Sequence, residues 1–300
     1  LGTSSLKFKD SFFGLVDAEN FKVNGGQGSD GQVLTSTGSG VAWETPSGGG
    51  ASSLNDLSDV LIQNNSMFVG TVPSNVNSAQ QNVGLGISAL ASITTGGYNT
   101  AVGKSALSSL TTSSFVTAVG FSAGQSWTTT GGEQVAVGHS AGKTNTAGGN
   151  TLVGARALEN DSAGNSNTVM GYWAMQQTEN ASNNTMVGYF AGYGNSSITN
   201  HGDNNTGIGM QALRSFTTTY DSVAVGSNAA YNLTSGIRTT VVGTQALNST
   251  TTGHRNLAIG YRSLWRPDTE SDNLAIGYEA LGGVIAGGEY NIAIGNHSAD

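Results

Sequence analysis

A short motif recurs thirteen times between residues 82 and 295 of this 300-residue chain. Each copy is a variant of Asn-x-Ala-Val-Gly followed by x-x-Ala-Leu, and the glycine of the first part serves as its reference position. Successive reference glycines lie 16 to 21 residues apart, most often 17. A near-constant short period means that one structural unit is stacked repeatedly, so the sequence predicts a solenoid without a central cleft. The reference glycines are Gly86, Gly103, Gly120, Gly138, Gly154, Gly171, Gly188, Gly209, Gly226, Gly243, Gly260, Gly277 and Gly295.

The three residues before each reference glycine have the pattern of a strand that is dry on both faces. The residue directly before the glycine is apolar in every copy, and the residue two positions earlier is Thr, Val, Leu or Ile. These two side chains share one face of a strand, while the middle side chain points the opposite way. The middle residue is Ala in seven copies and Gly in two, and it is never polar. Such a strand is typical of an all-β fold with a parallel sheet.

The middle position also bears on oligomeric state. A coil of about 17 residues encloses one row of side chains, and its other strand face would meet water. Residues 47–81 are too few to cover thirteen coils. We therefore expect the Ala/Gly face to meet sister chains around a shared axis, with a wider stretch at 152–186, where Leu152, Val169 and Met186 replace Ala.

An Asn stands four residues before the reference glycine in nine of the thirteen copies. Asn tolerates turn backbone, and its amide can bond the amide of the next coil, so these residues predict a structural ladder. The residues three and four after the glycine, commonly Ala and Leu, predict a second short strand or a corner. The predicted Asn ladder consists of Asn82, Asn99, Asn150, Asn167, Asn184, Asn205, Asn256, Asn273 and Asn291.

The segment before the repeats predicts hairpins and a joint. Residues 6–10 and 21–23 alternate like half-buried strands, and residues 32–43 predict a hairpin closed by a Ser/Thr/Gly loop. A second hairpin is predicted around Asn64 and Asn65. The predicted organisation is a small N-terminal β module at 1–46, a Gly/Ser joint with hairpin lead-in at 47–81, and a thirteen-repeat shaft at 82–300.

The repeats resemble two known families. Asn-Leu-Ala-Ile-Gly at 273–277 and Asn-Ile-Ala-Ile-Gly at 291–295 resemble the repeat of the YadA-type trimeric adhesin head, a left-handed parallel β-roll. The longer copy at 99–107 is more similar to repeats of bacteriophage tail-fibre proteins. Segments 31–44 and 53–60 resemble virion proteins of marine T4-like phages of cyanobacteria. The resemblance implies a parallel homotrimer that attaches to a host surface.

This resemblance leads to a functional expectation. It implies a structural and adhesive tail fibre in a phage virion, with other virion or fibre proteins as partners and a glycan or protein of the host surface as a further partner. The alternative is a bacterial trimeric surface adhesin or extracellular filament subunit at the cell surface. A signal peptide encoded upstream would favour the adhesin, and neighbouring capsid or tail genes would favour the phage. We also expect a trimerisation or self-cleaving chaperone segment after Asp300.

Composition argues against several other classes of protein. The formal net charge is −8, and the 11 Lys and Arg residues are scattered, which disfavours nucleic acid as a partner. No apolar run is long enough to cross a bilayer, so membrane insertion is not expected. The chain has no cysteine and therefore neither a disulfide framework nor a thiolate metal site.

Two segments match the hydrolase pattern Gly-x-Ser-x-Gly, at 120–124 and 138–142. Both stand where other coils have Ser-Ala-Leu, so we interpret them as by-products of the repeat and predict no enzyme and no catalytic residue. No metal or cofactor site is predicted, because the histidines lack metal-ligand spacing and are expected at the surface. The histidines are His139, His201, His254 and His297.

Two features could contact a receptor. An aromatic residue follows the reference glycine in five copies, and it could stack on sugars or on its neighbours in adjacent coils. Four extra residues lie between Gly188 and Gly209, which predicts a projecting loop or a plain tolerated insertion. The weak receptor-loop candidates there are Tyr193, His201 and Asp203.

Overall fold

The structure is a computed structural model, and it contains strands and turns but no helix in the residues that it describes. The chain forms two compact units, Leu1–Asp56 and Leu57–Asp300. The described residues are 33–36, 41–44, 57–76, 78–128, 132–195, 197, 201–266, 269–283 and 288–299. The predicted strands at 6–10 and 21–23 lie outside them.

The first unit contains the predicted N-terminal hairpin. Strands β1 (Val33–Ser36) and β2 (Val41–Glu44) pair in antiparallel register, with Val33 opposite Glu44 and Ser36 opposite Val41. The prediction of this hairpin is confirmed.

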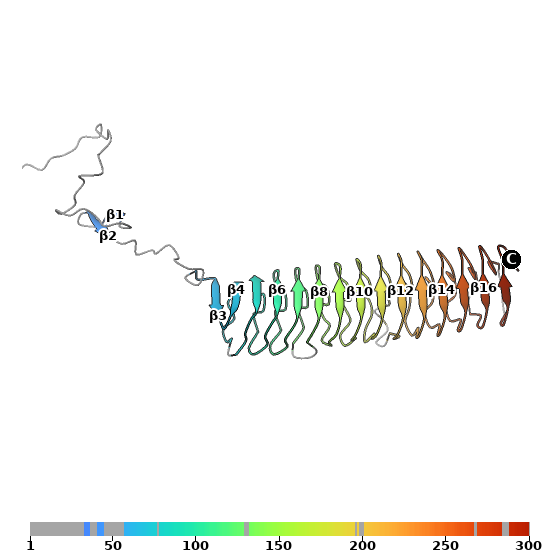
Figure 1. The fold of residues 1–300 in the computed structure, drawn as a ribbon, viewed down its shortest axis with the longest axis horizontal. Helices are drawn as coiled ribbons and strands as arrows, with labels where there is room; N and C mark the ends of the chain where they lie inside the picture. The colour runs from blue at the N-terminus through green and yellow to red at the C-terminus, as the bar shows by residue number, and fades with distance from the viewer. Residues whose placement is uncertain are drawn as a thin grey trace, which may run out of the picture. The chain divides into compact units, whose positions relative to one another are not determined.

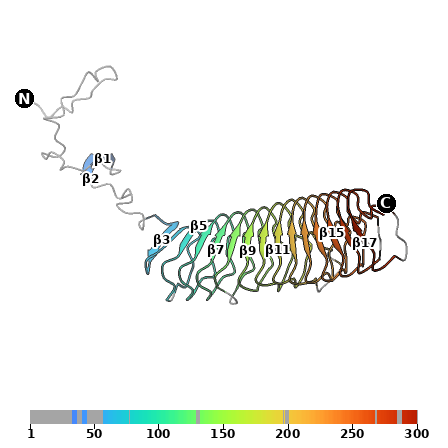
Figure 2. The same cartoon turned by 45° about the vertical axis from the view of Figure 1, so that its right-hand side comes forward.

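The second unit is a parallel β-solenoid in which every coil contributes one strand to a single 15-stranded sheet (Figures 1 and 2). Strands β5 to β17 pair in chain order and in parallel, with each residue opposite the residue at the same position in the next coil. The all-β solenoid and its period are confirmed. The repeat strands are β5 (Val83–Gly86), β6 (Thr100–Val102), β7 (Thr117–Val119), β8 (Val135–Val137), β9 (Thr151–Val153), β10 (Thr168–Met170), β11 (Thr185–Val187), β12 (Thr206–Ile208), β13 (Val223–Val225), β14 (Thr240–Val242), β15 (Leu257–Ile259), β16 (Leu274–Ile276) and β17 (Ile292–Ile294).

A hairpin begins this sheet. Strands β3 (Val60–Gln63) and β4 (Ser66–Gly70) pair in antiparallel register around Asn64 and Asn65, whose φ angles are 52° and 58°. Two consecutive positive φ angles are typical of the type I′ turn of a two-residue hairpin. Because β4 also pairs in parallel with β5, the predicted second hairpin belongs to the same unit as the shaft.

The reference glycines form a backbone contact that explains why the position is invariant among the thirteen coils. Their φ angles lie between 126° and 147°, a region that side chains with a Cβ rarely adopt. At Gly226 an added Cβ would lie 2.6 Å from the carbonyl carbon of Gly243 in the next coil. Glycine is therefore required both by its own backbone and by the close approach of the next coil.

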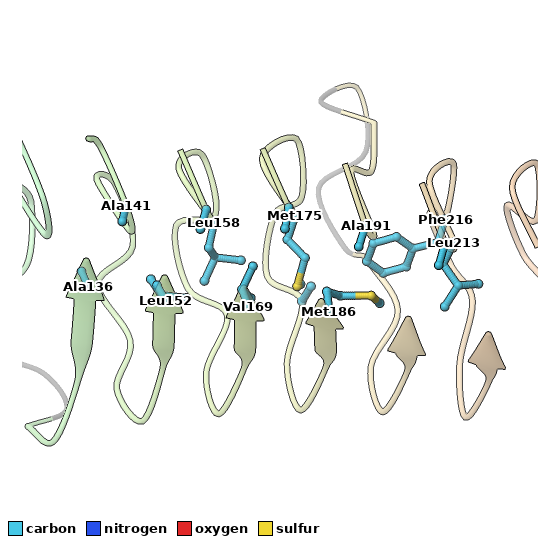
Figure 3. Close-up of a cluster of buried hydrophobic side chains, with 14 of the residues drawn as sticks. Ala136, Ala141, Leu152, Leu158, Val169, Met175, Met186, Ala191, Leu213 and Phe216 are labelled. Atoms are coloured by element: carbon cyan, nitrogen blue, oxygen red, sulfur yellow. The ribbon is translucent and has the colours of Figure 1, made fainter. Parts of the chain in front are cut away.

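The middle residue of each strand points into its own coil, not toward a shared axis. Ala101, Ala224 and Ala258 are completely buried in the single chain, as are Leu152 and Met186. Their neighbours in the core are the buried residues three and four after the reference glycine (Figure 3). The prediction that the Ala/Gly face meets sister chains is therefore wrong. The physical reason is that a narrow coil encloses the middle side chain opposite its own corner, where Ala or Gly fits beside a corner Leu.

The larger middle residues fill gaps inside the coil. Where Gly142 replaces the usual corner Leu, the Cδ1 atom of Leu152 occupies the space that a Cβ at Gly142 would need. Gly192 has the same relation to the sulfur atom of Met186. The prediction that 152–186 widens an axis between chains is therefore wrong, because these middle residues are buried inside the coil, where Leu152 and Met186 fill space left by corner glycines.

The Ala-Leu segment after the glycine forms the corner and not a second strand. In each coil the residues two and four after the reference glycine have positive φ, as Ser105 and Leu107 do at 60° and 49°. Alternating left-handed residues turn the chain sharply, and this turn places the intervening Ala in the core. Of the two predicted alternatives, the corner is the one that forms.

Candidate functional site

The outward face of the solenoid sheet is uncharged, apolar apart from threonine, and half-buried to exposed in the single chain. It is formed by the first and third strand residues of each coil, and none of these side chains is charged in any of the thirteen coils. Ile208 and Val242 are both 40% exposed, and Val223 is 37% exposed. With about 4.8 Å between strands, this outward strand face is roughly 60 Å long and ~10 Å wide. Apolar patches of this size usually mark interaction surfaces.

The aromatic residues after the reference glycine stack mainly on one another. The rings of Tyr172 and Tyr189 lie 5.9 Å apart and nearly parallel, and those of Tyr261 and Tyr278 lie 5.3 Å apart. Phe121 stacks on His139 of the next coil. Of the two alternatives for this stripe, stacking between coils is the one that the structure contains, although the tyrosines also remain exposed.

The Asn residues form a ladder whose bonds pass mostly through the backbone. The Oδ1 atom of Asn82 accepts the backbone N–H of Asn99 at 3.0 Å, and the Nδ2 atom of Asn99 donates to the carbonyl of Ser113 at 2.9 Å. This pattern recurs along the shaft and satisfies buried backbone groups. Direct contacts between side-chain amides occur as well, such as 3.2 Å from Asn167 Nδ2 to Asn150 Oδ1.

The two Gly-x-Ser-x-Gly segments lie in corners of the solenoid. Ser122 and Ser140 are buried, and each occupies the left-handed position two residues after a reference glycine. Their backbone N–H groups bond the carbonyls of Lys104 and Phe121 in the preceding coils. The shared phase supports their interpretation as repeat positions, and no strand-to-helix turn surrounds them in the described part of the chain.

The insertion between Gly188 and Gly209 is anchored by two of the three loop candidates. His201 is buried, which corrects the prediction of a surface histidine. Its Nδ1 and Nε2 atoms each lie 3.1 Å from a backbone nitrogen, of Glu179 and Asn195 respectively. Neutral imidazole has one acceptor nitrogen, so one of these contacts at a time is a hydrogen bond. Burial lowers the pKa of His201, which favours this neutral form.

Asp203 supports the same region. Its Oδ1 atom accepts the backbone N–H of Ser182 at 2.7 Å, which links it to the preceding coil. Tyr193, the third candidate, is different because its ring lines an open pocket with a volume of about 450 Å³.

The pocket beside Tyr193 contains an arginine held between aromatic rings. The guanidinium carbon of Arg214 lies 5.4 Å from the ring centres of Tyr193 and Tyr231 and 5.7 Å from that of Phe190. Tyr193, Arg214 and Tyr231 are each the fifth residue after a reference glycine, in three successive coils. The coil period therefore stacks tyrosine, arginine and tyrosine.

Arg214 has no anionic partner among the described residues. Its Nε atom is buried and has no hydrogen-bond acceptor. Other arginines of the shaft do have carboxylate neighbours, as in the pair between Arg255 and Asp272 at 2.6 Å and the pair between Arg262 and Glu279 at 3.7 Å. Arg214 as a whole is half-buried and lines the open pocket, so its terminal guanidinium nitrogens are suited to an external anion.

Sequence reasoning did not identify Arg214, Tyr231 or Phe190 as candidates. The signal that could have found the first two is their phase, because aligning the fifth residue after each reference glycine puts an arginine between two tyrosines. The acceptor-free Nε atom could not be read from the sequence, because it depends on how the side chains of three successive coils pack around Arg214.

The buried carboxylate of Asp161 belongs to the core and is satisfied there. Asp161 accepts backbone N–H groups of Gly164 and Ala181 and the side-chain amide of Asn145. Burial raises the pKa of Asp161, and these hydrogen bonds oppose that shift. With its acceptor sites used internally, this carboxylate is a structural group of the coil.

Comparison with protein-family models, with curated proteins and with solved structures found no match. Within the described ranges, no group of three or more His, Cys, Asp or Glu residues is placed to hold a metal ion. No helix in the same ranges is long and apolar enough to span a membrane.

Proposed function

We propose that this chain is the shaft of a parallel homotrimeric fibre that attaches a phage virion to a host surface. The observation that carries the proposal is the uncharged outward strand face, which extends over all thirteen coils. A face of this length and composition is suited to burial against copies of itself, because matching coils of parallel chains present the same row at the same height.

The physical properties of the coil support a fibre. Each coil contacts its neighbours in sequence, so length is gained by adding coils and the shaft has no central cleft. Parallel association of three shafts would display three copies of any binding site on one rigid rod. Multivalent display strengthens attachment even where each single site binds weakly. The resemblance of the repeats to tail-fibre and YadA-type repeats supports the number three and the attachment role.

The oligomer is tested by the mass of the full chain in solution, measured by light scattering after size exclusion. We expect three times 30.4 kDa. Ile208→Asp and Val242→Asp place a charge on the outward strand face and should shift the mass toward that of one chain. Ser235→Asp is the matched control, since it adds the same charge at a half-buried position outside the strand and should leave the trimer intact. A monodisperse wild-type monomer would refute the proposal.

The attachment role is tested separately, by adding purified trimer to host cells before infection. If the chain is a tail-fibre shaft with a receptor site, excess trimer should reduce adsorption of the phage that encodes it. Unchanged adsorption at saturating trimer, together with a reading frame outside any phage tail region, would favour the bacterial surface adhesin instead.

A further inference from the structure

We propose that the pocket around Arg214 binds an acidic sugar, with the guanidinium edge holding the carboxylate or another oxyanion of the saccharide. The proposal rests on the attachment role above and names the chemistry of the ligand. The aromatic neighbours of Arg214, its lack of an internal acceptor, the polar lining of the pocket and its place outside the outward strand face carry it.

The first argument is the way Arg214 is held. Tyrosine rings from the coil before and the coil after flank its planar guanidinium, at 5.4 Å each. Because Nε is buried, the two terminal nitrogens are the donors of this side chain that can serve a ligand in the pocket. A planar arginine edge matches the two oxygens of a carboxylate, or two oxygens of a sulfate or phosphate, better than any neutral acceptor.

The second argument is the absence of an internal acceptor. Among the described residues, Arg214 forms no ion pair, and its buried Nε has no hydrogen-bond partner. Arg262 stands in a comparable aromatic setting beside Tyr261 and Trp265, but it bonds the Oε1 atom of Gln245 at 2.8 Å. The contrast shows that stacking in this solenoid does not itself leave an arginine without an acceptor.

The third argument is the composition of the pocket. Beside Arg214 it is lined by the amides of Gln177 and Asn195 and by hydroxyl-bearing Ser215 and Thr234. Amide and hydroxyl groups are suited to sugar hydroxyls, and a volume of about 450 Å³ accommodates one or two sugar rings. A pocket for an inorganic anion alone would need neither this size nor this many neutral polar groups.

The fourth argument is the location and charge of the site. None of the pocket residues belongs to the outward strand face, so parallel association through that face leaves the pocket open. The chain carries a net charge of −8, which repels polyanions in general. Binding of an acidic saccharide therefore requires a specific site and not a diffuse positive surface.

The test is calorimetric titration of the full chain with three oligosaccharides of similar length: oligogalacturonate, a sulfated dextran fragment and an uncharged dextran fragment. We expect the charged probes to bind and the uncharged one to bind at least tenfold more weakly. Stronger binding of oligogalacturonate assigns the anion to a carboxylate, and stronger binding of the sulfated probe assigns it to a sulfate ester. Equal binding of the uncharged fragment would overturn the proposal.

Variants locate the site. Arg214→Gln should weaken binding of the preferred probe by roughly tenfold to a hundredfold, the usual effect of losing a hydrogen bond to a charged group. Arg238→Gln removes the same charge from an exposed arginine that pairs with Asp221, and it should leave binding unchanged. If Arg214→Gln fails to fold, Ser215→Glu provides the second variant, because a carboxylate at the pocket lining should occupy Arg214 and exclude the probe. Wild-type affinity in a folded Arg214→Gln or Ser215→Glu variant would refute the site.

Mass measurements on the same samples separate this inference from the trimer. A wild-type chain that binds the acidic probe as a monomer would refute the trimer and preserve the pocket. A trimer that binds none of the probes would refute the pocket and preserve the shaft. A trimer that is lost in Arg214→Gln, with no saccharide bound by the wild type, would show that Arg214 pairs with a carboxylate of a sister chain.

Discussion

The two faces of the solenoid sheet differ in what the fold requires of them. The inward face, formed by the middle strand residues, is buried, and its largest members fill space left by corner glycines, as Leu152 does beside Gly142. The outward face keeps apolar and Thr side chains in every coil although the single chain leaves it exposed. The fold of one chain explains the inward row. It does not explain why the outward row lacks charge, and this difference supports association between chains.

The largest expected difference between the faces comes from adding one carboxylate to strand β13. Ala224→Asp places an unpaired charge in the core, with an expected loss of more than ~4 kcal/mol and failure of the shaft to fold. Val223→Asp puts the same group one residue away on the outward strand face, where water solvates it. Circular dichroism should show a folded Val223→Asp shaft, and light scattering should show a reduced mass. Equal damage from both substitutions would remove the distinction between the faces.

Much of the fold could be predicted from the sequence because the solenoid is set by local repetition. The 17-residue period, the glycine phase and the two hairpins follow from residues close together in the chain. The orientation of the middle residues could not be predicted in the same way, because Ala and Gly fit either a crowded axis or a narrow coil. The deciding signal is internal compensation, in which Met186 is large where Gly192 leaves space.

The reference glycine that follows each strand should be the next most sensitive position to substitution. Gly226→Ala would bring a Cβ to within 2.6 Å of the Gly243 backbone at a φ of 137°, so we expect a loss of at least ~3 kcal/mol. Gly149→Ala is the control, because its φ is 73° and the nearest atom to the new Cβ is 3.5 Å away. That variant should lose only about 1–2 kcal/mol. Chemical denaturation measures both, and similar losses would mean that the stacked glycine backbone is not what restricts this position.

A smaller loss of stability is expected when one Asn of the buried ladder is removed. Asn167→Ala would leave the backbone N–H of Asn184 and the carbonyl of Ala181 without their present partners. Two unsatisfied buried groups cost roughly 2–4 kcal/mol together, which denaturation should detect. Asn165→Ala is the control on the exposed surface, with an expected change within ~0.5 kcal/mol. Hydrogen exchange should quicken first at the Asn184 amide, and unchanged protection there would contradict the ladder's structural role.

The smallest expected effect is on the pH dependence of stability. It tests whether His201 anchors the insertion to the neighbouring coil. Because burial lowers the pKa of His201 below the unfolded value of 6.5, the native state takes up this proton less readily than the unfolded chain. Its contribution is therefore fully present above pH 6.5 and is lost as the pH falls from there toward the folded pKa, by no more than about 1.4 kcal/mol per pH unit. Asp161 has the opposite sign, because its raised pKa adds stability as the pH falls toward 3.8.

The melting temperature should thus decline between pH 7.5 and 5.5, and His201→Asn should abolish this decline, since Asn keeps an acceptor near the Glu179 N–H without titrating. An identical decline in both proteins would mean that His201 stays solvated and that the insertion is not anchored through it.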